Sequence, residues 1–246
     1  MKETYAASIG QGSFDHSIFD RLLGDHVDGE GLVDYPGLGQ EVKELDRYLT
    51  QVAGADFSEL SRDEKLAFLI NAYNAFTLRL MLEHPAVSSI RNISASDRWD
   101  AKRWMLAGET VSLSGIEHKR IRPHFIEPRV HWALVCAAIG CPPLRAEAYS
   151  GARLEEQLAA QTQRVFTRKT RWYQVSENQK TVKVSAIMNW YRGDFVQVNG
   201  SLANFVATQD SAIAQAIAMD KTPSVAFLDY DWSLNSQANR GQLNLP

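Results

Sequence analysis

The chain has 246 residues, a formal net charge of −3 and two cysteines. Its composition, with 45% hydrophobic and 22% charged residues, is that of an ordinary globular protein and excludes intrinsic disorder. The balanced charge gives no electrostatic footprint for nucleic acid or an anionic membrane. Two cysteines exclude a disulfide scaffold and a four-cysteine zinc site. The sequence contains no run of about 18 apolar residues, so no membrane span is predicted.

No linker or internal repeat divides the sequence. We therefore expect a helical N-terminal extension over residues 1–55, packed on a single α+β domain over residues 56–246. Apolar residues at helical spacing predict short amphipathic helices over residues 14–23 and 38–52. The N-terminus lacks the apolar segment of a signal peptide.

The strongest predicted element is a helix that begins after Ser61 and ends before Pro85. Ser61 and Glu64 have the spacing of a capping box. Apolar residues cover nearly the whole circumference of the helix that follows, so we expect it at the centre of the fold. Asn71 and Asn74 lie inside it, where asparagine is unfavourable. Each is either a clamp that ties a loop to the helix or an amide that lines a pocket and orients a catalytic group.

The remaining strands fall in pairs. A hairpin is predicted over residues 104–113, a second over residues 172–184 and a last strand over residues 225–232. Because strands cluster in hairpins and do not alternate with helices, we predict an α+β fold in which the central helix packs on a mainly antiparallel sheet. Further helices are expected over residues 150–166, 185–191, 201–208 and 211–219.

Segment 129–144 carries most of the residues with reactive side chains. Taken as a strand, residues 129–137 place His131 on one face and Cys136 on the other, so Cys136 is expected in the core. Cys141 lies in a Gly-Cys-Pro-Pro turn just past this strand. A thiol held near His131 there has the features of a nucleophile with its general base. A buried Cys141, or a disulfide between Cys136 and Cys141, is the alternative.

Glu117, His118 and Asp231 are further candidates. Ser114 and Glu117 have the spacing of a capping box, and His118 lies either on the surface or facing His131. Asp231 either caps a turn or completes a Cys/His/Asp set. No motif predicts a metal site, a phosphate-binding loop or a dinucleotide fold, and we expect no cofactor.

Together these segments resemble proteins of the family called domain of unknown function 547, over residues 56–235. Glu127 departs from the family pattern, because an Asp is usual there. The resemblance implies no established reaction. Family members often look exported, which implies a periplasmic or cell-envelope location, with the cytoplasm as the alternative. The matching segments are NAYN at 71–74, LSGIEH at 113–118, PRVHWALVC at 128–136, CPPL at 141–144, WY at 190–191, DF at 194–195 and YDWSLN at 230–235.

The order of elements is also similar to that of the papain/transglutaminase group. In that group a nucleophilic cysteine begins the central helix and a histidine lies on a following strand. His131 matches the histidine strand, but the central helix offers no cysteine. The nucleophile has therefore either moved to Cys141 or been lost from a relative that keeps a pocket.

Three hypotheses follow. The first is a thiol-dependent hydrolase or transferase acting on peptide or amide bonds, with Cys141 as nucleophile and His131 as general base. The second is a module that binds a peptide or small molecule without turnover. The third is an acid–base enzyme that uses His118, His131 and Glu117 without a thiol. No membrane span and no nucleic-acid partner are expected, and the oligomeric state is left open. The residues expected to orient groups around the pocket are Asn71, Asn74, His118, Arg129 and Asp231, and for the thiol enzyme the orienting group is Asn74, Glu117 or Asp231.

Overall fold

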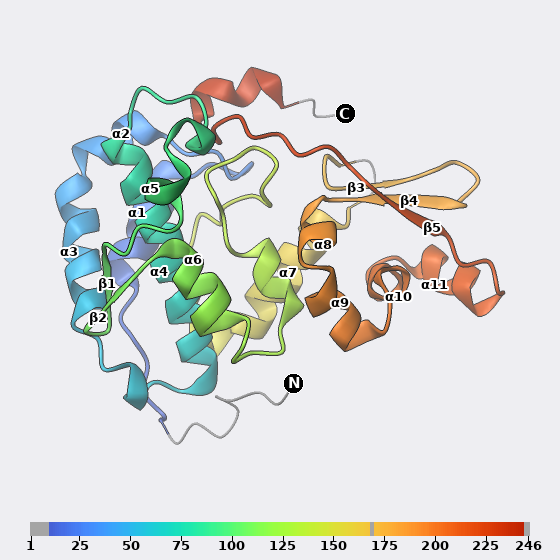
Figure 1. The fold of residues 1–246 in the computed structure, drawn as a ribbon, viewed down its shortest axis with the longest axis horizontal. Helices are drawn as coiled ribbons and strands as arrows, with labels where there is room; N and C mark the ends of the chain where they lie inside the picture. Colours follow the sequence, from blue (N-terminus) through green and yellow to red (C-terminus); the bar gives the residue numbers. More distant parts are fainter. Residues whose placement is uncertain (1–9, 168–169, 244–246) are drawn as a thin grey trace.

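The computed structural model describes residues 10–167 and 170–243. The predicted N-terminal helices are confirmed, with the second one split in two at Glu41. In Figure 1 they lie together on one side of the molecule, against the central helix. These elements are α1 (Ser17–His26), α2 (Tyr35–Gln40), α3 (Val42–Ala53) and α4 (Arg62–Glu83).

Helix α4 is buried nearly all round, as predicted, with 17 of its 22 residues buried. The Ser61 side chain accepts a hydrogen bond from the Glu64 N–H at 3.3 Å. The Glu64 carboxylate does not complete a capping box, because it binds His16 Nε2 at 3.1 Å and the Gly151 N–H at 2.8 Å. The start of α4 thus ties the N-terminal segment to a loop 87 residues further along the chain.

The strands confirm the α+β class. Strands β1 (Trp104–Leu106) and β2 (Glu109–Val111) form an antiparallel hairpin, and Phe76 of α4 stacks on Trp104 at 4.9 Å between ring centroids. A second, three-stranded sheet lies on the opposite side of the molecule in Figure 1. Its order is β3 (Tyr173–Val175), β4 (Thr181–Val184) and β5 (Ser224–Phe227), with β3 antiparallel and β5 parallel to β4.

Two hydrophobic clusters make the core. The larger surrounds α4, and the smaller lies between the three-stranded sheet and the helices beside it. Trp132 is fully buried in the smaller cluster. The chain then returns to the first half, where Val33 donates its N–H to Asn235 and accepts one from Gln237. The helices near the smaller cluster are α7 (Leu154–Val165), α8 (Ile187–Trp190), α9 (Arg192–Asn199), α10 (Leu202–Ala207) and α11 (Ser211–Ala218).

The predicted strand over residues 129–137 is wrong. Residues Pro128–Trp132 form a 3-10 turn, η5, capped by the Glu127 side chain. The apolar residues that suggested a strand are buried by packing around this turn and take part in no strand pairing. A proline at the first position of the turn has the φ that a helical turn requires, and periodicity cannot distinguish a short buried turn from a buried strand.

The second predicted capping box is also wrong. Ser112, and not Ser114, accepts the N–H of Gly115 at 3.0 Å. Residues Ile116–Ile121 then form a π-helical turn, η4, in which the Arg122 N–H bonds to the Glu117 carbonyl. Glu117 is therefore free of a capping role.

The predicted helix near residue 150 begins as a 3-10 turn, and Ser150 makes no side-chain capping bond. The last strand ends at Phe227, five residues earlier than predicted. Among the described residues, no helix is long and apolar enough to cross a membrane. The remaining short elements are η2 (Phe57–Glu59), η3 (Ile90–Asn92), α5 (Ala95–Arg98), α6 (Leu113–Gly115), η6 (Gly151–Arg153) and η7 (Gln237–Gln242).

Candidate functional site

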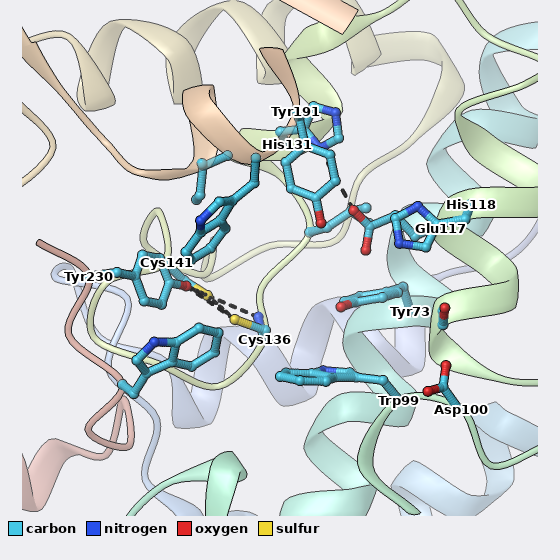
Figure 2. A pocket seen from close by; sticks show the side chains of 15 residues that line it. Tyr73, Trp99, Asp100, Glu117, His118, His131, Cys136, Cys141, Tyr191 and Tyr230 are labelled. Atoms are coloured by element: carbon cyan, nitrogen blue, oxygen red, sulfur yellow. Dashed lines mark hydrogen bonds and ion pairs between the residues drawn. The ribbon is translucent and has the colours of Figure 1, made fainter. Parts of the chain in front are cut away.

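A cavity of about 410 Å³ opens between the two halves of the molecule (Figure 2). Its wall includes Tyr73 from the larger cluster and Ile187 from the smaller one. The volume is typical of small-molecule sites. Asp100 and Glu117 line the cavity, and none of its described lining residues is Lys or Arg. Six aromatic side chains line it: Tyr73, Trp99, Trp190, Tyr191, Tyr230 and Trp232.

One end of the cavity holds an imidazole between two carboxylates. The His131 side chain is only 1% exposed, and its Nε2 lies 2.8 Å from Asp194 Oδ2. Its Nδ1 lies 3.8 Å from Glu117 Oε1. The Tyr191 ring stacks on the imidazole at 3.9 Å between centroids, so the ring of His131 has little freedom to turn.

Asp194 is held in turn by Arg122. The guanidinium donates from Nε to Asp194 Oδ2 at 2.7 Å and from Nη2 to Oδ1 at 3.0 Å. Burial opposes ionisation of Asp194, but the hydrogen bonds with His131 and Arg122 outweigh it and hold the pKa of Asp194 well below its ordinary value. Asp194 is therefore an anion that accepts the Nε2–H of His131.

Glu117 lies beside this imidazole on the π-helical turn η4, a type of turn that is frequent at functional sites. Burial, followed by the charge of Glu117, raises the pKa of Tyr191 well above its ordinary value. His118, the next residue, is exposed, and its Nδ1 accepts a hydrogen bond from Arg122 Nη1 at 3.0 Å. Figure 2 shows Glu117, His118, His131 and Tyr191 grouped at one end of the cavity.

The other end holds both cysteines (Figure 2). Their sulfur atoms lie 2.8 Å apart as free thiols. The Tyr230 hydroxyl lies 3.1 Å from Cys136 Sγ and 3.0 Å from Cys141 Sγ. The Cys136 N–H also donates to Cys141 Sγ at 3.0 Å.

The two cysteines differ in solvent exposure in the opposite sense to the prediction. Cys136, predicted to be core, is half-buried, whereas Cys141 is 3% exposed. The prediction was wrong because it assumed a strand in which Cys136 faces away from His131. No hydrogen bond joins either sulfur to His131 or His118 among the described residues, so the structure does not bring the proposed Cys141–His131 pair into direct contact.

Asn71 and Asn74 both act as clamps in the structure. Asn71 exchanges two hydrogen bonds with the backbone of Tyr149, at 2.7 and 2.9 Å. Asn74 donates to the Ala133 carbonyl and accepts from the Val135 N–H, both at 2.9 Å. Neither lines the 410 Å³ cavity.

Two other candidates also lie outside the lining of this cavity. Arg129 pairs with Glu127 and Glu155. Asp231 is exposed, and its Oδ1 accepts the Ser233 N–H at 2.8 Å. No hydrogen bond from the Asp231 side chain to a thiol or a histidine is found in residues 10–167 and 170–243.

Sequence reasoning missed Asp194, Arg122, Tyr191 and Tyr230 as site residues. Three of them lie in the short aromatic and acidic segments that carry the family resemblance, at 190–195 and 230–235. An acidic residue within an aromatic segment was the available signal. Its partner was not predictable, because 63 residues separate Asp194 from His131.

The family model described as "Protein of unknown function, DUF547" matches residues 57–165. No curated protein and no solved structure matches the chain, so the likeness to the papain/transglutaminase group stays a prediction. The residues that the structure describes contain no group of three or more His, Cys, Asp or Glu side chains placed to hold a metal ion.

Proposed function

We propose that the DUF547 segment of this chain, with the aromatic segments that follow it, forms the active site of an acid–base enzyme acting on a small neutral or cationic molecule. The observation that carries the proposal is the clamping of His131 between Asp194 and Glu117 on the wall of the cavity. In this reading Asp194 is the orienting residue, His131 the general base, and Glu117 its partner toward the ligand.

The tautomer follows from the hydrogen bonds. Asp194 is ionised and accepts a hydrogen bond from the Nε2–H of His131, so the neutral imidazole has its lone pair on Nδ1, facing Glu117. The 3.8 Å between His131 Nδ1 and Glu117 Oε1 is too long for a direct hydrogen bond. A water or ligand hydroxyl that donates to Nδ1 satisfies this arrangement, and the imidazole can take its proton and return it to a leaving group.

The lining supports the expected ligand class. Six aromatic rings favour a ligand with apolar or aromatic faces. Asp100 and Glu117, with no Lys or Arg among the described lining residues, disfavour an anionic ligand.

A thiol-dependent hydrolase is the second candidate. Burial opposes ionisation of Cys141, but hydrogen bonds from the Cys136 thiol and the Tyr230 hydroxyl outweigh it and lower the pKa of Cys141. Its sulfur also faces the cavity. The lack of a hydrogen-bonded imidazole places this candidate second, because thiol hydrolases commonly need an adjacent base.

The test is consumption of small molecules from a cell extract, followed by mass spectrometry with wild type, His131→Gln, Glu117→Gln and Cys141→Ser. We expect wild type and Cys141→Ser to consume the same compound, and His131→Gln to be slower by roughly 10²–10⁴-fold, the usual contribution of a general base. His84→Gln, outside the cavity lining, is the matched control.

Other outcomes separate the alternatives. Consumption that is lost in Cys141→Ser and kept in His131→Gln makes the protein a thiol enzyme. A compound that raises the melting temperature of wild type and His131→Gln alike, without turnover, makes it a binding module.

A further inference from the structure

The two thiols are held face to face by a tightly fixed loop. The Cys141 N–H bonds to the Ala138 carbonyl at 3.1 Å, and Ala137 takes a left-handed φ of 59°. The indole N–H of Trp172 donates to the carbonyls of Gly140 and Cys141, at 3.2 and 3.0 Å. These bonds fix the backbone of the turn that carries Cys141.

The C-terminal segment fixes the same loop from a second side. Gly140 donates its N–H to Asp231 at 2.8 Å, and a Cβ on Gly140 would meet the backbone of Asp231 at 2.9 Å. Ile139 donates to Ser233 at 2.8 Å. The loop therefore approaches the segment that carries Tyr230 so closely that only glycine fits at position 140.

The two sulfur atoms differ in access to the cavity. Cys136 is half-buried and Cys141 is 3% exposed, so a reagent that enters the cavity meets Cys136 more easily. Cys141 Sγ receives hydrogen bonds from the Cys136 N–H and from the Tyr230 hydroxyl. A sulfur with several donors is stabilised as a thiolate.

The pair shares its protons. The hydrogen bond with Cys141 and then burial raise the pKa of Cys136, whereas the same contact lowers that of Cys141. The singly ionised pair therefore carries its charge mainly on Cys141 and its proton on Cys136, which is hydrogen-bonded to Cys141 across the 2.8 Å contact.

We propose that Cys136 and Cys141 form a dithiol that exchanges with small-molecule disulfides inside the cavity. Cys136 attacks one sulfur of the disulfide RSSR while its proton passes to Cys141 across the 2.8 Å contact. The S–S bond of RSSR breaks, RS⁻ leaves, and Cys136 is joined to the second RS group.

Cys141 then completes the exchange. It returns the proton to RS⁻, giving RSH, and its thiolate attacks Cys136 Sγ and expels the second group as RS⁻. In sum, Cys136–SH, Cys141–S⁻ and RSSR react to give the Cys136–Cys141 disulfide, RSH and RS⁻. Two electrons pass from the two cysteines to the reagent. The number of protons and the total charge are the same on both sides. The Tyr230 hydroxyl donates a hydrogen bond to the Cys141 thiolate and is a positioning residue for the exchange.

This activity is independent of the acid–base chemistry proposed above. The thiols lie at the opposite end of the cavity from His131 in Figure 2, and no hydrogen bond between them is found in the described residues.

The test uses the full chain, fully reduced, freed of reductant and mixed with 2-hydroxyethyl disulfide, a small neutral disulfide that suits the lining of the cavity, with intact-mass spectrometry at successive times. Wild type is expected to lose two hydrogen atoms and to keep no adduct. Cys141→Ser is expected to accumulate one 2-mercaptoethanol adduct, on Cys136, because the resolving thiol is absent. Cys136→Ser is expected to stay unmodified for far longer, at least tenfold, because Cys141 is buried.

Three outcomes overturn the proposal. They are a stable adduct on wild type, adduct formation on Cys136→Ser as fast as on Cys141→Ser, and thiols that react only after unfolding. Far-ultraviolet circular dichroism confirms that each variant is folded, and the Cys136→Ser/Cys141→Ser double variant gives the background.

The second test uses Tyr230→Phe, which keeps the ring and removes one donor to Cys141 Sγ. Loss of this hydrogen bond raises the pKa of Cys141, so the pH midpoint of the exchange rate should move upward while the limiting rate at high pH stays within about twofold. Tyr149→Phe is the matched control and should leave the midpoint unchanged, because Tyr149 lies outside the cavity lining and no hydrogen bond to its hydroxyl is found in the described residues. A midpoint that is the same in Tyr230→Phe and wild type shows that Tyr230 does not position the thiolate.

Discussion

Asn74 satisfies two backbone groups that would otherwise be buried without partners. Its amide binds the Ala133 carbonyl and the Val135 N–H directly after the turn that carries His131. Ala133 and Val135 are nearly inaccessible to water. A single side chain of α4 thus shapes the chain between the imidazole at one end of the cavity and the thiols at the other.

Asn74→Ala should be strongly destabilising. It leaves a buried donor and a buried acceptor without partners, at roughly 1–3 kcal/mol for each group. Urea denaturation followed by circular dichroism measures the change in the free energy of unfolding. Asn92→Ala, the same substitution at an exposed position, should stay within about 0.5 kcal/mol. Equal effects in the two variants would show that the clamp does not stabilise the fold.

At the scale of elements, the β1–β2 hairpin shows how closely the turn between two strands is adapted. Ala107 and Gly108 connect the strands, and both have positive φ, 48° and 79°. Such a pair matches the right-handed twist of a hairpin. The two N–H groups bond to the Val52 and Ala53 carbonyls at the end of α3, so the turn also joins the hairpin to the N-terminal helices.

Ala107 pays a strain that glycine would not, since a left-handed conformation costs a residue with a Cβ about 1–2 kcal/mol. Ala107→Gly should therefore be neutral or stabilising by up to about 1 kcal/mol, the greater flexibility of glycine in the unfolded chain offsetting part of the gain. Gly108→Ala, where a Cβ meets no atom within 4 Å, should destabilise through strain alone. Thermal unfolding of both variants measures the change in stability. A destabilised Ala107→Gly together with a stabilised Gly108→Ala would contradict the left-handed turn.

At the scale of the whole molecule, the cavity exists only because two clusters pack together. Trp132 lies in the smaller cluster, where its ring is 5.3 Å from that of Phe195. The neighbouring His131 binds Asp194 of the same helix, α9. The site residues that lie within residues 57–165 are therefore held in place by a part of the chain that the family model does not cover.

Phe195→Ala should lower the stability of the entire protein by on the order of 3–5 kcal/mol, as for other buried aromatic residues. Because both clusters contribute to one site, we expect a single calorimetric transition at a lower temperature. Val198→Ala, an exposed position on the same helix, is the matched control and should change little. Two separate transitions, with the larger cluster unfolding at the wild-type temperature, would show that the halves are independent.

The sequence by itself determined the α+β class, the buried helix α4 with its Ser61 cap, the N-terminal helices and both hairpins. These follow from hydrophobic spacing and local capping, which act over a few residues. The family resemblance also rested on sequence alone and holds for residues 57–165.

Only the tertiary structure decided how the site is arranged. The turn at Pro128–Trp132 was taken for a strand because buried apolar residues have the same composition in both. The partner of His131 and the contact between the two thiols depend on packing between segments that are far apart in the chain or joined by an irregular loop. Local pattern indicates which residues are buried, whereas hydrogen-bond partners are set by the path of the whole chain.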